Sequence, residues 1–400
     1  MKILHVYKGY PPVVGGMENH VRLLAERQAR RGLDVTVLSA SARGRGSLRD
    51  ENGVRVIRTR PWVTLASAPL SPGMALWMRR LTPDVTHLHF PYPPGEIAHR
   101  LLGRGRATIV SYQSDIVRQR WLGRLYGPLM RRVLADADRV LVSSAAYLES
   151  SPHLQRIAAK CSVVPLGIEP AAFRVPDNGR SAGIRRREGA PLVLFVGKLR
   201  YYKGVDVLIE AAERIDACIL IAGTGPMEAR LRRQASASRA ARRIRFLGEV
   251  ADEDLPYYYA AADLVVLPSS HRSEAFGIVL LEAMAAGRPV VSTELGTGTS
   301  FVNQHGVTGL VVAGRDPAGL AGAVNRLLAD PAERRRMGDN GRRRVDEVFP
   351  IEKMVDRMLA IYREALGGRG AAGGSGSGSG ESGAGEPEGR GGPTRRRGLG

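Results

Sequence analysis

Short runs of β-branched residues alternate with helical stretches along most of the chain, and this alternation restricts the fold more than any other feature. Such a pattern is typical of parallel sheets whose strands are joined by helices. It runs from Ile3 to Leu166 and restarts at Leu192, after a turn-rich, charged segment at 176–189. The sequence therefore predicts an α/β fold with two Rossmann-like, doubly wound parallel-sheet domains.

The strands predicted in the first half are Ile3–Tyr7, Val35–Ser39, Val54–Arg58, Val85–Phe90, Thr108–Tyr112, Val140–Ser143 and Val163–Leu166. Those predicted in the second half are Leu192–Val196, Cys218–Ala222, Ile244–Leu247, Leu264–Pro268 and Val290–Thr293. Helical stretches are expected at Met17–Arg31, Ile116–Ala135, Val205–Arg214, Glu228–Ala240 and Gly277–Ala286.

The restart of the pattern places the domain boundary near Gly167–Glu169. Residues 1–168 are expected to form the first domain and residues 169–350 the second. A final helix over Ile351–Leu366 follows Pro350 and is able to pack back on either domain. Residues 367–400 are rich in Gly, Ser and Glu and have almost nothing to bury, so we expect this tail to be disordered.

The net charge of +20 is concentrated in residues 1–168, which hold 25 Lys and Arg against 11 Asp and Glu. This field favours an anionic partner, a membrane surface or nucleic acid, and an arginine-rich proteome explains it equally well. No apolar run approaches the roughly 18 residues that span a bilayer, and the first residues lack a signal peptide's pattern. Cys161 and Cys218 are interpreted as reduced core residues, so a cytoplasmic location is expected.

Two parallel sheets in sequence predict a ligand cleft between the domains, outside the carboxyl ends of the strands. The segment Ser273–Gly287 follows the predicted strand Leu264–Pro268, which puts Phe276 and Gly277 at a helix start. The free N–H groups and positive dipole end of such a start suit a phosphate or a sugar hydroxyl.

Two glutamates belong to the same segment. Glu282 lies among apolar residues, where a carboxylate is costly unless it is paired or binds a polar group such as a ribose diol. A structural ion pair to a neighbouring Arg is the alternative for Glu282. For Glu274, the alternative to a ligand-binding role is a plain helix-capping carboxylate.

Glycine-containing turns follow three other predicted strands. Gly197, Lys198 and Lys203 come directly after Leu192–Val196, and two fixed cations there suit a departing diphosphate, although loop lysines are usually just solvated. Gly223 and Gly225 form a short turn that either admits a nucleotide or only joins a strand to a helix.

The third such turn lies in the first domain. Gly15 and Gly16 open the helix that starts near Met17, which makes a second anion-accepting helix start on the other side of the cleft. A helix with only packing duties rarely needs two glycines at this place, so we favour a functional role.

Two sets of residues imitate metal sites. Asp136 and Asp138 resemble the carboxylate pair of metal-dependent sugar transferases, but they precede a strand, and we interpret them as a solvated helix end. The histidines His5, His87, His89 and His99 have no ligand spacing with carboxylates or thiols, and core or cleft packing is the preferred interpretation. No metal site is predicted.

Taken together, the Glu274-x7-Glu282 pair, the Gly197-to-Gly204 turn, Gly223-Thr224-Gly225-Pro226 and Gly15-Gly16-x-Glu18 resemble the signature of family 4 retaining glycosyltransferases of the GT-B fold. The resemblance extends from about Met1 to Leu366. The segments that look most like bacterial mannosyl- or rhamnosyltransferases of polysaccharide and O-antigen assembly are His89–Pro91, Ser114–Val117, Tyr201–Gly204 and Ser292–Gly298.

The resemblance implies an acceptor-side first domain and a second domain that binds a nucleotide sugar. Lys198 and Lys203 would bind the donor diphosphate, and Glu274 would contact the transferred sugar. The N–H groups of Phe276 and Gly277 would support phosphate or sugar, and Glu282 would hold the ribose. Gly16 would let the N-terminal loop close on the phosphates. The family needs no metal or other cofactor and retains the anomeric configuration.

Two positions depart from the family pattern. Lys198 stands where the family usually has Arg, which keeps the charge but loses bidentate geometry. Gln113 stands where the family usually has a His near the transferred sugar. Glutamine donates and accepts hydrogen bonds but carries no charge, so this position bears on the rate of transfer.

The resemblance favours GDP-mannose as the donor, with other nucleoside-diphosphate sugars open, and a glycan or lipid-linked acceptor. The basic residues around Trp121 and Tyr126 suit a helix on an anionic membrane, or equally a solvated basic helix. A non-catalytic binder of nucleotide sugars is the alternative that Gln113 suggests. A nucleic-acid-binding protein would leave Glu274 and Glu282 unexplained, so no nucleic-acid partner is expected.

Overall fold

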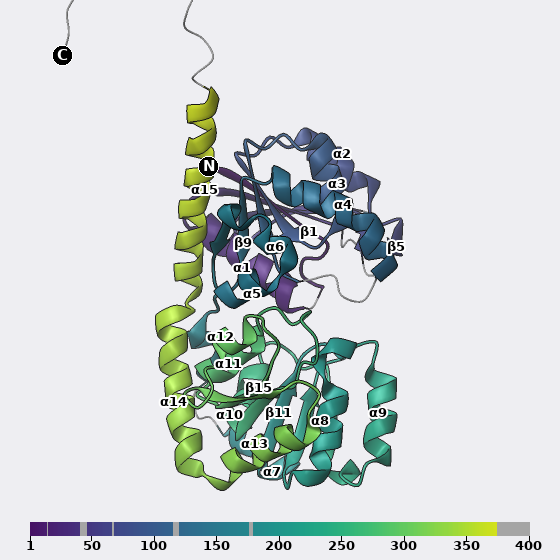
Figure 1. Cartoon of the computed structure of the whole chain (residues 1–400), viewed down its shortest axis with the longest axis vertical. Helices are drawn as coiled ribbons and strands as arrows, with labels where there is room; N and C mark the ends of the chain where they lie inside the picture. The colour runs from purple at the N-terminus through teal and green to yellow at the C-terminus, as the bar shows by residue number, and fades with distance from the viewer. Residues whose placement is uncertain (14, 41–45, 66–67, 115–119, 176–178, 374–400) are drawn as a thin grey trace, which may run out of the picture.

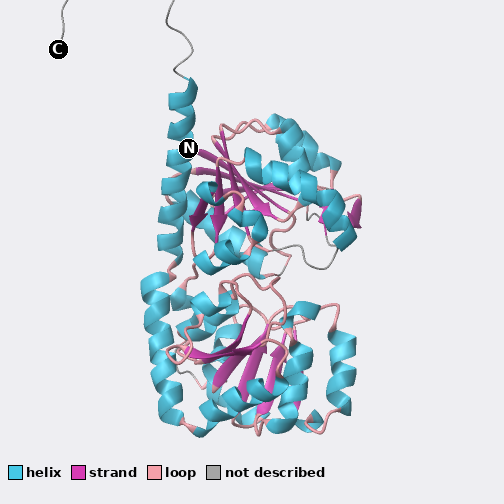
Figure 2. Ribbon diagram, in the orientation of Figure 1, coloured by secondary structure: helices cyan, strands magenta, loops and turns pink. Residues whose placement is uncertain are grey.

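The computed structural model describes residues 1–13, 15–40, 46–65, 68–114, 120–175 and 179–373, and the rest is drawn in grey in Figure 1. Figure 2 shows two sheets, one in each half of the molecule, with helices packed around each. The sequence prediction of two parallel-sheet α/β domains is confirmed.

The first sheet has the strand order β10-β9-β8-β7-β1-β2-β4-β3, and only β3 runs antiparallel to its neighbour. Its strands are β1 (Lys2–Tyr7), β2 (Asp34–Ser39), β3 (Ser47–Glu51), β4 (Val54–Arg58), β7 (Val85–Phe90), β8 (Ala107–Tyr112), β9 (Arg139–Val142) and β10 (Cys161–Val163). The helices of this half are α1 (Gly16–Arg30), α2 (Pro72–Arg80), α3 (Pro93–Leu102), α4 (Arg120–Asp136), α5 (Ala145–Ser150) and α6 (Pro152–Gln155).

The second sheet is parallel throughout, with the strand order β13-β12-β11-β14-β15-β16. Its strands are β11 (Leu192–Val196), β12 (Cys218–Ala222), β13 (Ile244–Gly248), β14 (Leu264–Leu267), β15 (Val290–Glu294) and β16 (Gly309–Ala313). Its helices are α7 (Arg180–Glu188), α8 (Val205–Ala211), α9 (Glu228–Ala237), α10 (Leu255–Ala261), α11 (Ile278–Ala285), α12 (Thr299–Val302), α13 (Pro317–Ala329) and α14 (Pro331–Val348).

Strand order reverses at one point in each sheet. In the first sheet the reversal lies between β1 and β7, and in the second between β11 and β14. The loops that follow these strands leave the same edge of the sheet and diverge, which is where open α/β sheets bind ligands. In the second sheet they are the loops at 197–204 and 268–277.

Several predicted elements need correction. The strand predicted at Val163–Leu166 lies at Cys161–Val163, because Pro165 has no N–H for the ladder. The sequence prediction missed β3, β16 and a small antiparallel hairpin, β5 (Val63–Leu65) and β6 (Ala68–Leu70).

The last helix, α15 (Ile351–Gly373), is longer than predicted. It was expected to end at Leu366, but it continues into the segment predicted as disordered tail. The remainder of that predicted tail, residues 374–400, lies outside the described residues.

The chain passes between the domains twice, and the two passages are hydrogen-bonded to each other. The amide of Ile168 donates to the carbonyl of Phe349 at 3.0 Å, and the amide of Ile351 donates back to Ile168 at 2.8 Å. A β-carbon on Gly167 would lie 2.8 Å from Cα of Ile351, so only glycine permits this approach.

Beyond the second passage, α15 leaves the second domain and packs along the first (Figure 1). Its apolar residues, including Met358, Leu359 and Tyr362, join Ile109 of β8 in one buried cluster. At the surface, Arg31 at the end of α1 binds Glu352 and Asp356. The helix therefore completes the core of a domain whose other residues lie more than 180 positions earlier.

Four histidines, His5, His20, His87 and His89, are buried in the first domain. Burial lowers the pKa of His5 and of His20 to about 4, and it lowers the pKa values of His87 and His89 well below the usual value. All four are therefore neutral at pH 7, where a buried charge would be costly.

These buried neutral histidines should make the folded protein less stable in acid. Between pH 6.5 and pH 4 the unfolded chain binds protons at these positions and the folded chain does not, so stability falls as the pH falls. We expect His5 and His20 each to remove about 2 kcal/mol from the free energy of unfolding between pH 7 and pH 5. Urea denaturation at the two pH values measures this. Neither ring nitrogen of His20 has a partner among the described residues, so His20→Leu should reduce the pH dependence by one histidine's share. An unchanged pH dependence in that variant would contradict the argument.

Candidate functional site

The two loops at the reversal point of the second sheet are joined by a buried ion pair. Nζ of Lys203 lies 2.6 Å from Oε2 of Glu274, and the hydroxyl of Ser269 donates to the same oxygen at 3.0 Å. Burial alone would lower the pKa of Lys203, but the attraction of Glu274 outweighs it and the pKa lies above its usual value. The lysine is therefore charged, and Oε1 of Glu274, which has no partner among the described residues, is open to a ligand.

Glycines allow the neighbouring loops to approach this pair. A β-carbon on Gly223, where φ is 130°, would overlap the carbonyl oxygen of Gly197, and one on Gly225 would lie 2.6 Å from the carbonyl oxygen of Leu199. These two glycines pack the turn after β12 against the loop after β11. Their immediate role is therefore close packing of one loop on the other.

The start of α11 is the third part of the second domain's site. Gly277 is the N-cap residue with φ 82°, a left-handed conformation that favours glycine. Phe276 is buried and its ring packs edge-on against Phe349 at 6.0 Å between centroids. The first N–H groups of α11 have no partners within the helix, so they are available to an anion.

Glu282 lies one turn into α11. Its Oε2 accepts a hydrogen bond from the hydroxyl of Tyr259 at 2.6 Å, and burial raises the pKa of this carboxyl group. The ion pair to Arg considered as an alternative is not found among the described residues. Tyr259 occupies one carboxylate oxygen and leaves the other for a polar ligand.

The N-terminal glycine loop reaches this site from the first domain. A β-carbon on Gly15 would overlap the carboxylate of Glu18 and would lie 3.1 Å from Nζ of Lys198. Gly16, the first residue of α1, has open space around it, with no atom within 4 Å of such a β-carbon. The start of α1 and Lys198 therefore meet across the domain junction.

Further basic residues gather at this junction. Burial lowers the pKa of Lys8, which follows β1, and the charges of Arg200 and Lys198 lower it further, whereas Glu18 raises it. A cluster of cations around one carboxylate, drawn from both domains, suits a polyanionic ligand. Lys8 and Arg200 were not predicted, because a lysine or arginine in a loop carries no sequence signal of its own.

Gln113 follows β8, and its side chain is hydrogen-bonded to a histidine. Its side-chain nitrogen lies 3.1 Å from Nδ1 of His89, and the ring of His89 packs edge-on against Tyr7. Arg200 and Tyr202 of the second domain lie near enough to Tyr7 to act on its pKa. Gln113 therefore belongs to the same junction as the lysines and Glu274.

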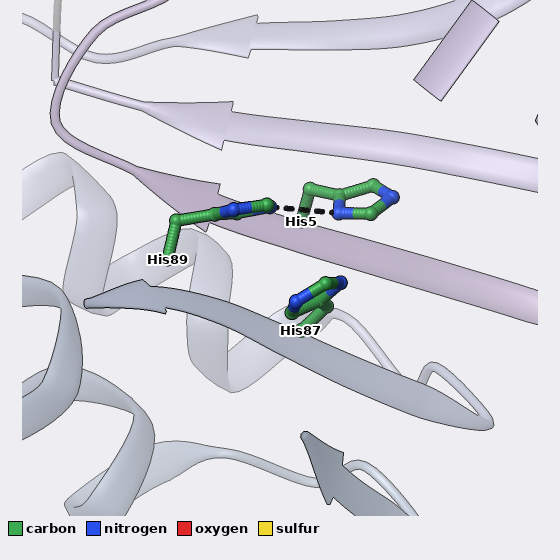
Figure 3. Close-up of side chains that lie close together, drawn as sticks. All are labelled: His5, His87 and His89. Atoms are coloured by element: carbon green, nitrogen blue, oxygen red, sulfur yellow. Dashed lines mark hydrogen bonds between the residues drawn. The ribbon is translucent and has the colours of Figure 1, made fainter. Parts of the chain in front are cut away.

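The three histidines His5, His87 and His89 come close enough together to be considered as metal ligands (Figure 3). The rings of His87 and His89 are stacked, with 4.3 Å between centroids and 24° between planes. The lone pairs of their ring nitrogens therefore lie in nearly parallel planes. All six ring nitrogens of the three residues have hydrogen-bond partners. This geometry fits a hydrogen-bonded chain better than a shared ion.

Other predicted features lie away from the junction. Asp136 pairs with Arg100 and ends α4 as predicted, but Asp138 accepts a hydrogen bond from the amide of Thr108 and is structural. Cys161 and Cys218 are free thiols. They were predicted to lie in the core, but both are only half-buried. The basic segment from Arg118 to Arg132 was expected to be either a membrane-surface helix or a solvated helix, and Arg118 lies outside the described residues.

Family models match both halves of the chain. The model of glycosyltransferase family 4 matches residues 14–172, and that of the group 1 glycosyl transferases matches residues 180–344. Two parallel-sheet domains with their ligand loops facing one junction define a GT-B glycosyltransferase. The chain belongs to family 4 of these enzymes.

Similar proteins cover nearly the whole chain. The O-antigen chain mannosyltransferase C of Escherichia coli is 38% identical over 92% of this chain and 99% of its own. The D-rhamnosyltransferase WbpZ of Pseudomonas aeruginosa is 38% identical over 87% of this chain and 92% of its own. The sucrose-phosphate synthase of Thermosynechococcus elongatus superposes with a TM-score of 0.78 at 25% identity, over 92% of this chain and 99% of that structure.

Substitution by alanine should change stability differently in the two glycine loops. Gly223→Ala forces the loops after β11 and β12 apart, and we expect it to lower the free energy of unfolding by about 1–3 kcal/mol. Gly16→Ala fills open space at a helix start, so stability should stay the same or rise slightly. Thermal and urea denaturation of both variants would compare them. Equal loss of stability in the two would contradict the loop packing described here.

Proposed function

We propose that this glycosyltransferase moves a hexose, with mannose favoured, from a nucleoside-diphosphate sugar to a glycan or lipid-linked acceptor in the assembly of a cell-surface polysaccharide. The observation that carries the proposal is the ion pair of Lys203 with Glu274, together with the contact of Lys198 with the glycine loop of the first domain. The names of the Escherichia coli and Pseudomonas aeruginosa relatives support the sugar and the type of product.

In this proposal the donor diphosphate lies between the starts of α1 and α11. Lys198 and Lys203 bind its oxygens, and the open space beside Gly16 admits it. The ammonium of Lys203 has three donors, so it contacts a phosphate while it keeps its bond to Glu274. Glu282 accepts from the ribose through the oxygen that Tyr259 leaves unused.

Transfer would then proceed without a metal and with retention of configuration. Oε1 of Glu274 binds hydroxyl groups of the sugar, so the ion pair with Lys203 orients the sugar and the diphosphate relative to each other. As the glycosidic bond to the diphosphate breaks, the lysines stabilise the charge that develops on the leaving phosphate. The acceptor hydroxyl attacks from the face that the diphosphate leaves and passes its proton to a phosphate oxygen.

Binding of nucleotides tests this proposal. We expect one of GDP, UDP, dTDP or ADP, or its sugar nucleotide, to raise the melting temperature, and we expect EDTA to leave the rise unchanged. Glu282→Gln keeps the hydrogen bond from Tyr259 but loses the charge, so it should weaken binding about tenfold while the protein stays folded. The exposed Glu249→Gln is the matched control. No shift with any nucleotide would contradict the donor site, and a shift without sugar transfer would favour a non-catalytic binder.

We further propose that the first domain binds an anionic membrane, where a lipid-linked acceptor is found. Among the described residues no helix is long and apolar enough to cross a bilayer. The β5–β6 hairpin, however, exposes Trp62, Val63 and Leu65, with Trp62 81% exposed. Exposed Arg60 precedes the hairpin in the chain, and α2, which follows it, carries exposed Leu76, Arg79 and Arg80. The combination of exposed apolar groups and cations suits a lipid headgroup region.

Flotation with lipid vesicles tests the membrane proposal. The protein should bind vesicles that contain phosphatidylglycerol, bind less in high salt, and bind poorly to pure phosphatidylcholine. The double variant Trp62→Ser with Leu65→Ser should lower binding at least tenfold, because it removes the exposed apolar groups of the hairpin. Val307→Ser, an exposed position in the second domain, is the control. Equal binding by the hairpin variant and the control would remove the hairpin from the proposal.

A further inference from the structure

A chain of hydrogen-bonded side chains starts at Gln113, passes through Tyr362 of α15 and ends at Ser111 of β8, and the two side-chain amides in it set its direction. The side-chain nitrogen of Gln113 only donates, so Nδ1 of His89 must accept and the proton of His89 sits on Nε2. Nε2 of His89 lies 3.1 Å from Nδ1 of His5 (Figure 3), which must therefore accept in turn. This places the proton of His5 on its own Nε2.

The other end of this stretch leads independently to the same assignment. Nε2 of His5 lies 2.7 Å from Oε1 of Gln28, and an amide oxygen only accepts. His5 must therefore donate from Nε2 and keep Nδ1 as an acceptor, as deduced from the Gln113 end. The two deductions use different contacts, so the agreement is a real test of the chain.

The chain continues into the C-terminal helix. The amide nitrogen of Gln28 donates to the hydroxyl of Tyr362 at 3.5 Å, and Nδ1 of His87 lies 2.5 Å from that hydroxyl. Nε2 of His87 lies 2.7 Å from the hydroxyl of Ser111. The two amides make His5 and His89 neutral Nε2–H tautomers, and the same direction continued through the two hydroxyls makes His87 one as well.

We propose that His89 is a positioning residue that orients the amide of Gln113, so that its carbonyl oxygen and not its NH₂ group is presented at the domain junction. Oε1 of Gln113 has no partner among the described residues. The inference rests on the proposed function for what binds there. Gln113 acts as a hydrogen-bond acceptor for a hydroxyl group, either of the transferred sugar or of the acceptor. The chain through His5, Gln28 and Tyr362 opposes turnover of this amide alone, because every other member would have to change with it.

The cost of turning the amide explains why the chain is effective. If Gln113 presented its oxygen to His89, the proton of His89 would move to Nδ1, and its Nε2 would then face the lone pair of His5. Either two acceptors would meet, or the proton of His5 would move as well and the amide of Gln28 would have to turn over. In a site from which water is excluded, a partial change leaves an unmade hydrogen bond and is costly. The orientation of Gln113 at the junction is thus coupled to groups that reach α15, because the whole chain must change together.

Nuclear magnetic resonance of the full-length protein, labelled with ¹⁵N at its eight histidines, tests the chain. Long-range ¹H–¹⁵N spectra distinguish the two neutral tautomers from each other and from the charged ring. At pH 7 we expect His5, His87 and His89 to be Nε2–H tautomers, with assignment by single His→Gln variants. A charged ring or an Nδ1–H tautomer at any of the three would overturn the proposal.

Gln113→Glu provides the second arm. A carboxylate at position 113 cannot donate, so the ring of His89 must bring its proton to Nδ1, and its resonances should change to the other tautomer. Gln155→Glu makes the same chemical change on exposed α6 and should leave the spectrum of His89 unchanged. An unchanged His89 in Gln113→Glu would also overturn the proposal. These readouts need no ligand, so a failure of the nucleotide-binding experiment would sink the proposed function and leave this result standing.

Discussion

The hydrogen-bonded pair of passages between the domains is the constraint on which the rest of the structure depends. Ile168 exchanges two backbone hydrogen bonds with the segment around Pro350, and Gly167 allows the two strands to touch. This pairing sets the distance between the loops of one sheet and the facing loops of the other. Lys198 can meet the start of α1 beside Gly15 only because the domains are joined in this orientation. A change of angle at the passages would separate the cations of one domain from the glycine loop of the other.

The local geometry of the site follows from the order of the strands. Because β11 and β14 are neighbours at the reversal point, the loops that carry Lys203 and Glu274 start side by side. The buried ion pair then joins them, and Ser269 satisfies the same carboxylate oxygen. Removal of either charged partner would leave the other buried and unpaired, which is more damaging than the loss of the pair itself. The same contact therefore stabilises the loops and prepares the groups that are proposed to bind the donor.

Much of the fold could be predicted, because strand runs bounded by turn residues give a strong periodic signal. The fold class, the family and most strands of both sheets were predicted from that signal and from the motifs. Short or edge elements were not, since β3, the β5–β6 hairpin and β16 depend on pairing with distant strands. At the site, Glu274 and Lys203 could be proposed from their motifs. Their ion pair, the hydroxyl of Tyr259 on Glu282 and the histidines behind Gln113 could not, because these contacts join residues 23 to 84 positions apart. A lone Tyr or His in a strand or helix is indistinguishable from an ordinary core residue.

The path of α15 has a consequence for the order in which the molecule is made. The sheet face that holds His5 and His87 is covered by Gln28 of α1 and Tyr362 of α15. During synthesis the first 168 residues are made before the second domain, yet the helix that closes this face is translated after the second domain's elements. The first domain therefore keeps this apolar face uncovered until the second domain has been made. The halves named first and second by sequence are completed in the reverse order.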